Sequence, residues 1–147
     1  MKWIQGTFWI GLSATSLLAA YVIQSRRRRL GKVHFISWQE ANSINSNNIV
    51  AVDCSHDIFS CLTHHRTSHD IEFDDIRGDT STDMVLNAIQ SNHPLLSNIS
   101  LVTVNHFDID AFMSVWALMN PETCRKFKDA IRECAHIGDF RELGNCS

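Results

Sequence analysis

Short runs of apolar, often β-branched residues alternate along this chain with polar connections and with longer stretches whose apolar positions repeat at helical spacing. Residues 33–38, 49–52 and 99–104 are predicted β-strands, because β-branched runs of this length suit a sheet. Residues 79–83 are predicted to open one helix, and further helices are predicted over residues 111–119 and from residue 121. Strands and helices that alternate across short connections indicate an α/β domain with a small, mainly parallel sheet and flanking helices.

The polar residues between these runs predict where elements begin and end. Residues 41–48 are rich in Asn and Ser and predict a turn-like connection. The helix that residues 79–83 open has several possible capping residues among these five, and its predicted buried stripe is Met84, Val85, Ala88 and Ile89. The last helix is predicted to start at Pro121 and to end at Gly138, with an inner face of Phe127, Ala130, Ile131 and Cys134.

The polar turn between the strand at 99–104 and the helix at 111–119 carries the clearest chemistry. It places His106, Asp108 and Asp110 on alternate residues at the carboxyl end of a strand, where open α/β sheets bind ligands. Alternate side chains of an extended segment point the same way, so these three are expected to converge while Phe107 and Ile109 turn into the core. The pattern predicts a metal-binding or proton-handling site.

A plainer interpretation assigns the same residues to local structure. Asp110 would then be the N-cap of the following helix, Asp108 would favour the positive end of the helix dipole, and His106 would be hydrogen-bonded at the strand end. The strand at 49–52 also ends in a polar segment, which places Asp53 at the same edge of a parallel sheet as His106. A turn and capping cluster explains Asp53 equally well.

Composition and charge bound the class of protein. The 147 residues suit one small domain, 44% hydrophobic and 20% charged. The five cysteines form no Cys-x-x-Cys pair, which indicates reduced thiols and disfavours structural zinc. Lys2 and the four arginines at 26–29 are five of the 13 basic residues, which leaves eight against 16 acidic residues, a net charge of −8, in residues 30–147. A surface of this sign excludes a stable nucleic-acid partner.

The first thirty residues predict a separate unit. Residues 3–23 carry no charge and are long enough for a transmembrane helix, and the basic block at 26–29 follows them. By the positive-inside rule we expect a single-pass membrane protein, anchored through residues 3–23, whose domain faces the cytosol at the mitochondrial outer membrane or the endoplasmic reticulum. The domain organisation is then an anchor over residues 1–30 and an α/β domain over 31–147. An N-terminal helix of the folded core is the alternative.

Residues 99–111, a strand followed by Asn-His-Phe-Asp-Ile-Asp-Ala, resemble the first motif of the DHH phosphoesterase superfamily. The ordered motifs at 52–55, 62–64, 79–83, 105–110 and 137–140 are similar to an uncharacterised plant and bacterial family of unknown function. The resemblance implies the fold of the N-terminal half of DHH phosphoesterases, truncated here. It implies His106, Asp108 and Asp110 as ligands of Mn²⁺ or Mg²⁺, with Asp53 as a further ligand and His64 and Asp79 as neighbours.

Two functions are left open by the sequence. The favoured one is a membrane-anchored, non-enzymatic binding or scaffolding domain. The alternative is a Mn²⁺- or Mg²⁺-dependent phosphoester hydrolase, in which the metal lowers the pKa of a bound water and His64 or His106 transfers a proton to the leaving group. A thiol enzyme that uses Cys54 beside His56 is disfavoured, because no third orienting group is identifiable.

Overall fold

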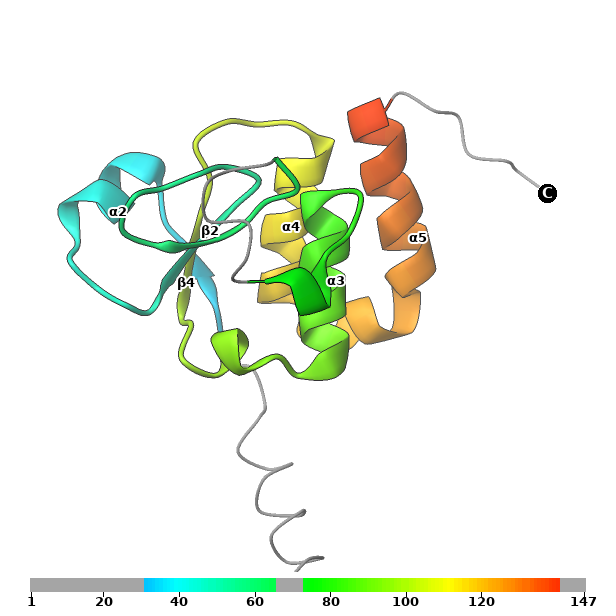
Figure 1. Ribbon diagram of the computed structural model, residues 1–147, viewed down its shortest axis with the longest axis horizontal. Helices are drawn as coiled ribbons and strands as arrows, with labels where there is room; N and C mark the ends of the chain where they lie inside the picture. The colour runs from blue at the N-terminus through cyan, green and yellow to red at the C-terminus, as the bar shows by residue number, and fades with distance from the viewer. Residues whose placement is uncertain (1–30, 66–72, 141–147) are drawn as a thin grey trace, which may run out of the picture.

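The computed structural model describes residues 31–65 and 73–140 and contains a four-stranded sheet (Figure 1). Its strands are β1 (His34–Phe35), β2 (Ile49–Val52), β3 (Ser60–Leu62) and β4 (Leu101–Thr103), in the spatial order β1-β4-β2-β3. All three strand pairings are parallel, with Val50 opposite Val102 and Val52 opposite Leu62. The predicted α/β class and parallel sheet are therefore confirmed.

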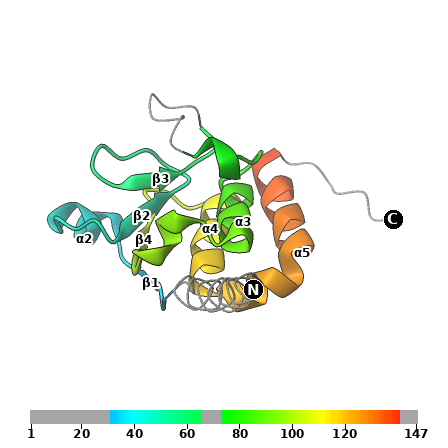
Figure 2. The ribbon, with the colours of Figure 1, turned by 60° about the horizontal axis from the view of Figure 1, so that its bottom comes forward.

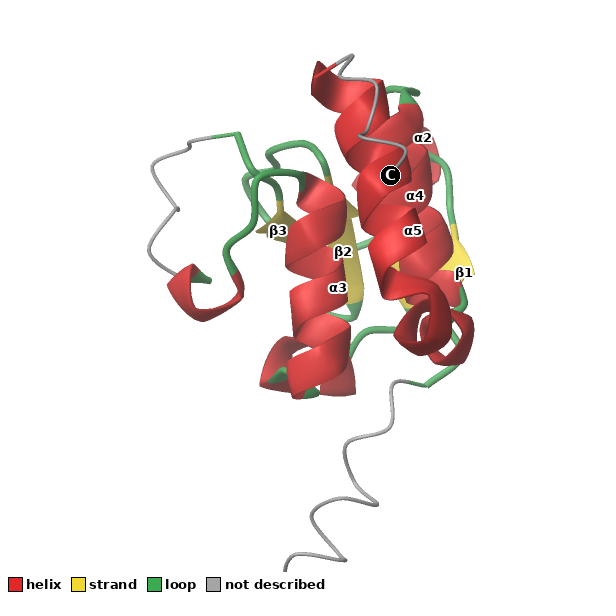
Figure 3. Ribbon diagram, turned by 90° about the vertical axis from the view of Figure 1, so that its right-hand side faces the viewer, coloured by secondary structure: helices red, strands yellow, loops and turns green. Residues whose placement is uncertain are grey.

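The helices form layers around this sheet. Helix α2 (Trp38–Ser43) lies on one side, and α3 (Ser81–Ser91) and α4 (Ile109–Met119) lie on the other (Figure 2). Helix α5 (Pro121–Phe140) packs against α3 and α4, away from the sheet (Figure 3). Two short 3-10 helices, η1 (Asp74–Ile76) and η2 (Pro94–Ser97), precede and follow α3. The larger apolar core fills the space between the sheet and α3, α4 and α5, and a smaller one lies under α2.

Helix α2 and strand β3 were not predicted. Helix α2 begins inside the predicted first strand, because Ser37 and Glu40 form a capping box in which each side chain accepts from the other residue's backbone N–H. Ala41 of α2 is fully buried and packs in the smaller core with Ile49 and Phe59. Strand β3 spans three residues, and pairing with β2 rather than a local apolar pattern makes it a strand.

Helix α3 agrees with its prediction and α5 only in part. Thr80 caps α3, and the predicted stripe of Met84, Val85, Ala88 and Ile89 is buried. In α5 the backbone of Phe127 is non-helical, which produces a kink. Beyond it, Ile131 is buried as predicted, together with Ala135. Phe127 and Cys134, which were predicted to face inward, are exposed. The helix also continues through Gly138 instead of ending there.

The predicted fold class and localisation need correction in one respect. Within residues 31–65 and 73–140, no helix combines the length and the apolar character that a membrane span requires. Helices α3 and α4 have 11 residues each, about 16 Å of rise against about 30 Å of hydrocarbon, and the longer α5 is charged throughout. The fold class is accordingly a small α/β domain, and the predicted single-pass localisation is contradicted by the helices described. Residues 3–23, where the span was predicted, lie outside the described residues.

Candidate metal centre

A buried carboxylate stands at the carboxyl end of the central strand β2. Asp53 follows Val52 directly and has a left-handed backbone conformation, with φ 52°, which Asp tolerates better than most residues. Its N–H still donates to the Leu62 carbonyl oxygen at 3.0 Å, so the turn is fixed by the sheet. The residue is 2% exposed, and Ser81 Oγ donates to its Oδ1 at 2.7 Å.

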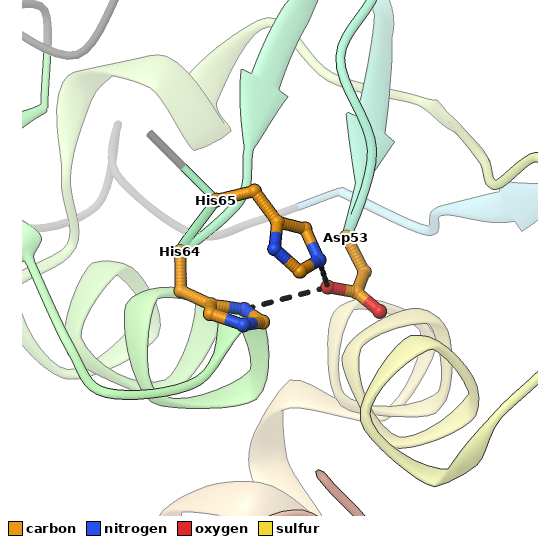
Figure 4. Close-up of side chains that lie close together, drawn as sticks. All are labelled: Asp53, His64 and His65. Carbon is orange, nitrogen blue, oxygen red and sulfur yellow. Dashed lines mark ion pairs between the residues drawn. The ribbon is translucent and has the colours of Figure 1, made fainter. Parts of the chain in front are cut away.

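Two histidines from the end of β3 face one oxygen of this carboxylate. His64 Nδ1 lies 3.5 Å and His65 Nε2 lies 3.6 Å from Asp53 Oδ1, and both rings point toward that atom (Figure 4). The two rings lie against each other with centroids 4.0 Å apart. Parallel pairing of β3 with β2 brings these histidines to Asp53, since Val52 and Leu62 are register partners.

The other oxygen of Asp53 faces the turn after β4. His106 Nε2 lies 3.1 Å from Asp53 Oδ2 and 2.9 Å from Asp108 Oδ2. Asp108 is also the N-cap of α4, because its Oδ1 accepts from the Ala111 N–H at 2.8 Å. The Asp108 side chain thus caps α4 with one oxygen and faces His106 with the other. The N-cap of α4 is Asp108, whereas the plainer interpretation had predicted Asp110.

Asp110 lies at the site, but backbone groups occupy its oxygens. It is fully buried, and its carboxylate accepts from the N–H groups of Ser81 at 2.8 Å and of Thr82 at 2.8 Å. These are unpaired amides of the first turn of α3, so Asp110 ties the start of α4 to the start of α3. Its Oδ2 is also 3.5 Å from His64 Nδ1.

Phe107 and Ile109 do not turn into the core as expected. Phe107 is 81% exposed. Its ring lies edge-to-face against the ring of Phe112, with the two ring centroids 6.1 Å apart. Phe107 precedes the N-cap and Phe112 is the fourth helical residue, so the pair forms a hydrophobic staple that sets the entry of the chain into α4. Ile109 is half-exposed and packs against Gly138 of α5.

Burial and neighbouring carboxylates disfavour the charged form of Asp53. Burial is the main cause that raises the pKa of Asp53; the hydrogen bond from Ser81 opposes it, and the charges of Asp110 and Asp108 add to it. Among the described residues the ion-pair partners of Asp53 are histidines, without a lysine or arginine. A buried acidic group of this kind lacks a permanent positive counter-charge.

Asp79 belongs to a second cluster, which includes Asp83 in the first turn of α3. Asp79, Asp83 and His136 bring one ligand atom each within 4.8 Å of one another. Asp83 accepts from His136 Nε2 at 2.7 Å and makes a short ion pair with Arg132. Burial alone would raise the pKa of Asp83, but the hydrogen bonds from His136 and Arg132 outweigh it and lower that pKa. This cluster therefore has its own permanent counter-charge.

Two groups that share Asp53 could hold a metal ion. They are Asp53 with His64 and His65, and Asp53 with His106 and Asp108. Neighbouring ligand atoms around an octahedral Mg²⁺ are roughly 3 Å apart. The distances from His106 Nε2 to the oxygens of Asp53 and Asp108, 3.1 and 2.9 Å, match this spacing. The distances from His64 and His65 to Asp53 Oδ1, 3.5 and 3.6 Å, are slightly wider. Carboxylate and imidazole are ligands that Mn²⁺ and similar divalent ions accept.

The tertiary structure thus brings Asp53, His64, His106, Asp108 and Asp110 together and leaves Asp79 outside this group. His65, Ser81 and Asp139 also lie at the site and were not predicted as site residues. The position of His65 beside His64 at a strand end was the available signal. The thiol alternative is not supported, because burial raises the pKa of Cys54 to about 11 and His56 bonds to Asn42 instead.

Comparisons with known proteins give the family. A family model described as "Family of unknown function (DUF6687)" matches residues 31–146, most of the chain. The searches of curated proteins and of solved structures found no match. The family match fits the predicted uncharacterised family. The predicted likeness to the N-terminal half of DHH phosphoesterases is not supported by these comparisons. The chain belongs to this family of unknown function.

Proposed function

We propose that this protein is a divalent-metal-dependent hydrolase of phosphoesters, with Mn²⁺ or Mg²⁺ held between Asp53 and the histidines around it. One observation carries the proposal. The two oxygens of a buried carboxylate face two separate sets of ligand groups, His64 and His65 on one side and His106 and Asp108 on the other. Asp53 would thus help to hold an ion on either side of its carboxylate.

Electrostatics favour a cation at this position over the second cluster. The charges of Asp110 and Asp108 add to burial in raising the pKa of Asp53, and the neighbouring histidines are not permanent charges. At Asp83, by contrast, Arg132 already supplies a positive charge. A divalent ion would stabilise the first set and would compete with an arginine at the second.

The site has the exposure that a substrate needs. His65 is 57% exposed, His106 is 39% exposed and Asp108 is 46% exposed, so the ligand groups open to solvent while Asp53 and Asp110 anchor them from below. A bound ion supplies two effects, polarisation of a phosphoryl oxygen and a lowered pKa of a bound water. Because the protein's own groups here are acidic, the ion is also what would attract an anionic substrate.

Each residue then has a distinct role. His64, His65, His106, Asp53 and Asp108 are proposed as ligands. Relative to the predicted ligands His106, Asp108, Asp110 and Asp53, this set adds His64 and His65 and omits Asp110. Asp110 is proposed as the residue that fixes the helix starts around the site, because its oxygens accept from Ser81 and Thr82. The metal site rests on this donor set, and phosphoesters as the substrate class rest on the resemblance of residues 99–111 to the DHH motif.

The test is Mn²⁺ binding by the full 147-residue chain, measured by calorimetry, followed by hydrolysis of p-nitrophenyl phosphate and bis-p-nitrophenyl phosphate. Asp53→Asn and Asp108→Asn are the variants, and Asp129→Asn, an exposed acid of α5, is the matched control. We expect micromolar binding and metal-dependent hydrolysis, both lost in the two variants and kept in the control. Binding without hydrolysis of any phosphoester would leave the non-enzymatic binding domain, and absence of binding by folded protein would overturn the proposal.

A further inference from the structure

Helix α5 reaches the candidate metal centre at its last turn. Asp139 Oδ2 lies 3.5 Å from His64 Nε2, while the other ring nitrogen of His64, Nδ1, faces the site. On that side Nδ1 is 3.1 Å from Ser81 Oγ and 3.5 Å from Asp110 Oδ2. The imidazole of His64 is therefore held between the site on one edge and a carboxylate from a different helix on the other.

This arrangement matters because a histidine binds metal through one unprotonated nitrogen while the other carries the proton. A carboxylate that accepts from the second N–H fixes which nitrogen is free, orients the ring and raises its basicity as a ligand. We propose that Asp139 is a positioning residue, which holds the proton of His64 on Nε2 and so presents Nδ1 to the ion beside Asp53. The inference rests on the proposed function, since it concerns a ligand of the same site.

The same face of α5 is attached to the start of α3 by further contacts. Arg132, His136 and Asp139 are four and three residues apart, so they lie along one stripe of the helix. The first two bind Asp83 in the first turn of α3, and the third reaches His64. Helix α5 is thus fixed against α3 by two side chains whose partner, Asp83, is not at the metal centre. Among the described residues, the ion-pair partner of Asp139 is His64.

The contact between α5 and α4 brings Asp139 close enough. Gly138, its neighbour, has no Cβ, and one built there would be 2.2 Å from the Cβ of Ile109. Only glycine lets the two helices approach this closely. The motif at residues 137–140 that the sequence singled out therefore combines a close helix contact with a site residue.

Two measurements on the full chain test the inference. The first is Mn²⁺ affinity by calorimetry for wild type, Asp139→Asn and Asp139→Glu, with Asp129→Asn as the control of equal charge on the same helix. Loss of such a carboxylate partner costs about 10- to 100-fold in metal affinity, so we expect that loss in Asp139→Asn and recovery of most of it in Asp139→Glu. Asp129→Asn should bind as wild type does, and all four proteins should keep the same thermal unfolding temperature within a few degrees.

The second measurement needs no variant. Nitrogen NMR of the histidine rings in the Mg²⁺-loaded wild-type chain should show His64 protonated at Nε2 and unprotonated at Nδ1. Protonation at Nδ1 would overturn the inference, as would Asp139→Asn protein that binds Mn²⁺ with the affinity of the control; either result leaves the proposed function standing. Failure of the wild-type chain to bind any divalent ion would instead remove the proposed function and this inference with it.

Discussion

Gly138 of α5 and Ile109 of α4 are in closer contact than any other residue type at position 138 would allow. A Cβ built on the glycine would lie 2.2 Å from Ile109 Cβ and 2.7 Å from its Cγ2. Real Cβ atoms do not approach backbone-proximal side-chain atoms this closely, so the contact sets the spacing of the two helices. Ile109 follows the capping residue Asp108, and Gly138 precedes Asp139, so this single contact connects two parts of the candidate metal centre.

Gly138→Ala should therefore weaken both the fold and the site. Helix propensity alone would favour alanine, but the clash with Ile109 forces the helices apart and costs about 1–3 kcal/mol of unfolding free energy. Chemical denaturation measures this loss. A second substitution, Ile109→Ala, should recover part of it in the double variant by making room, and purely additive effects would contradict the contact.

Asp53→Asn should stabilise the metal-free protein. The pKa of Asp53 is raised by burial, so the folded state binds a proton more tightly than the unfolded chain, and metal-free stability rises as the pH falls toward the ordinary value of 3.8. At neutral pH the buried charge costs free energy that asparagine avoids, and asparagine also tolerates the left-handed backbone. We expect a gain on the order of 1 kcal/mol, a few degrees in Tm, together with loss of Mn²⁺ binding.

The opposite pH dependence is expected from Asp83. His136 and Arg132 lower the pKa of Asp83 in the folded state. Its contribution to the free energy of unfolding is therefore fully present above its ordinary pKa of 3.8, and it is lost as the pH falls through the lower pKa of the folded state. Asp83→Asn should lose about 2 kcal/mol at neutral pH and show less further loss on acidification below pH 4 than wild type does. Urea denaturation across this range checks it, and parallel curves for the two proteins would contradict it.

Asp110→Asn should destabilise the fold more than Asp108→Asn does. Both oxygens of Asp110 accept backbone N–H groups of α3, and an amide offers only one acceptor, so one buried N–H loses its partner at a cost of about 1–3 kcal/mol. Asp108 is half-exposed, and its capping oxygen is retained in asparagine. Thermal unfolding of the two variants without metal distinguishes them, and equal Tm values would argue against the structural role of Asp110.

The cysteines should differ sharply in reactivity. Burial raises the pKa of both Cys54 and Cys124 to about 11, whereas Cys134 is exposed. Brief treatment of the native protein with iodoacetamide, read by peptide mass spectrometry, should therefore label Cys134 and leave Cys54 and Cys124 unmodified. Rapid labelling of Cys54 would reopen the thiol-enzyme alternative.

The sequence by itself determined the α/β class of the described domain and most of its elements. Periodicity and capping residues identified α3 and its buried stripe, and the β-branched runs identified β2 and β4, because these signals are local and need no partner. The rule that parallel strands end at one edge of a sheet was enough to predict that Asp53 lies near His106, and the two side chains are in contact.

Tertiary contacts decided the remainder. Strand β3 exists through its pairing with β2, and that register brings His65 beside Asp53. Asp110 became a partner of α3 because α3 and α4 pack side by side, and Asp139 reached His64 because Gly138 lets α5 lie against α4. The bonds from Ser81 and Thr82 to Asp110 join residues 29 and 28 positions apart. A one-dimensional pattern carries no information on which distant backbone amide or ring nitrogen a carboxylate will meet, because that depends on how the elements pack.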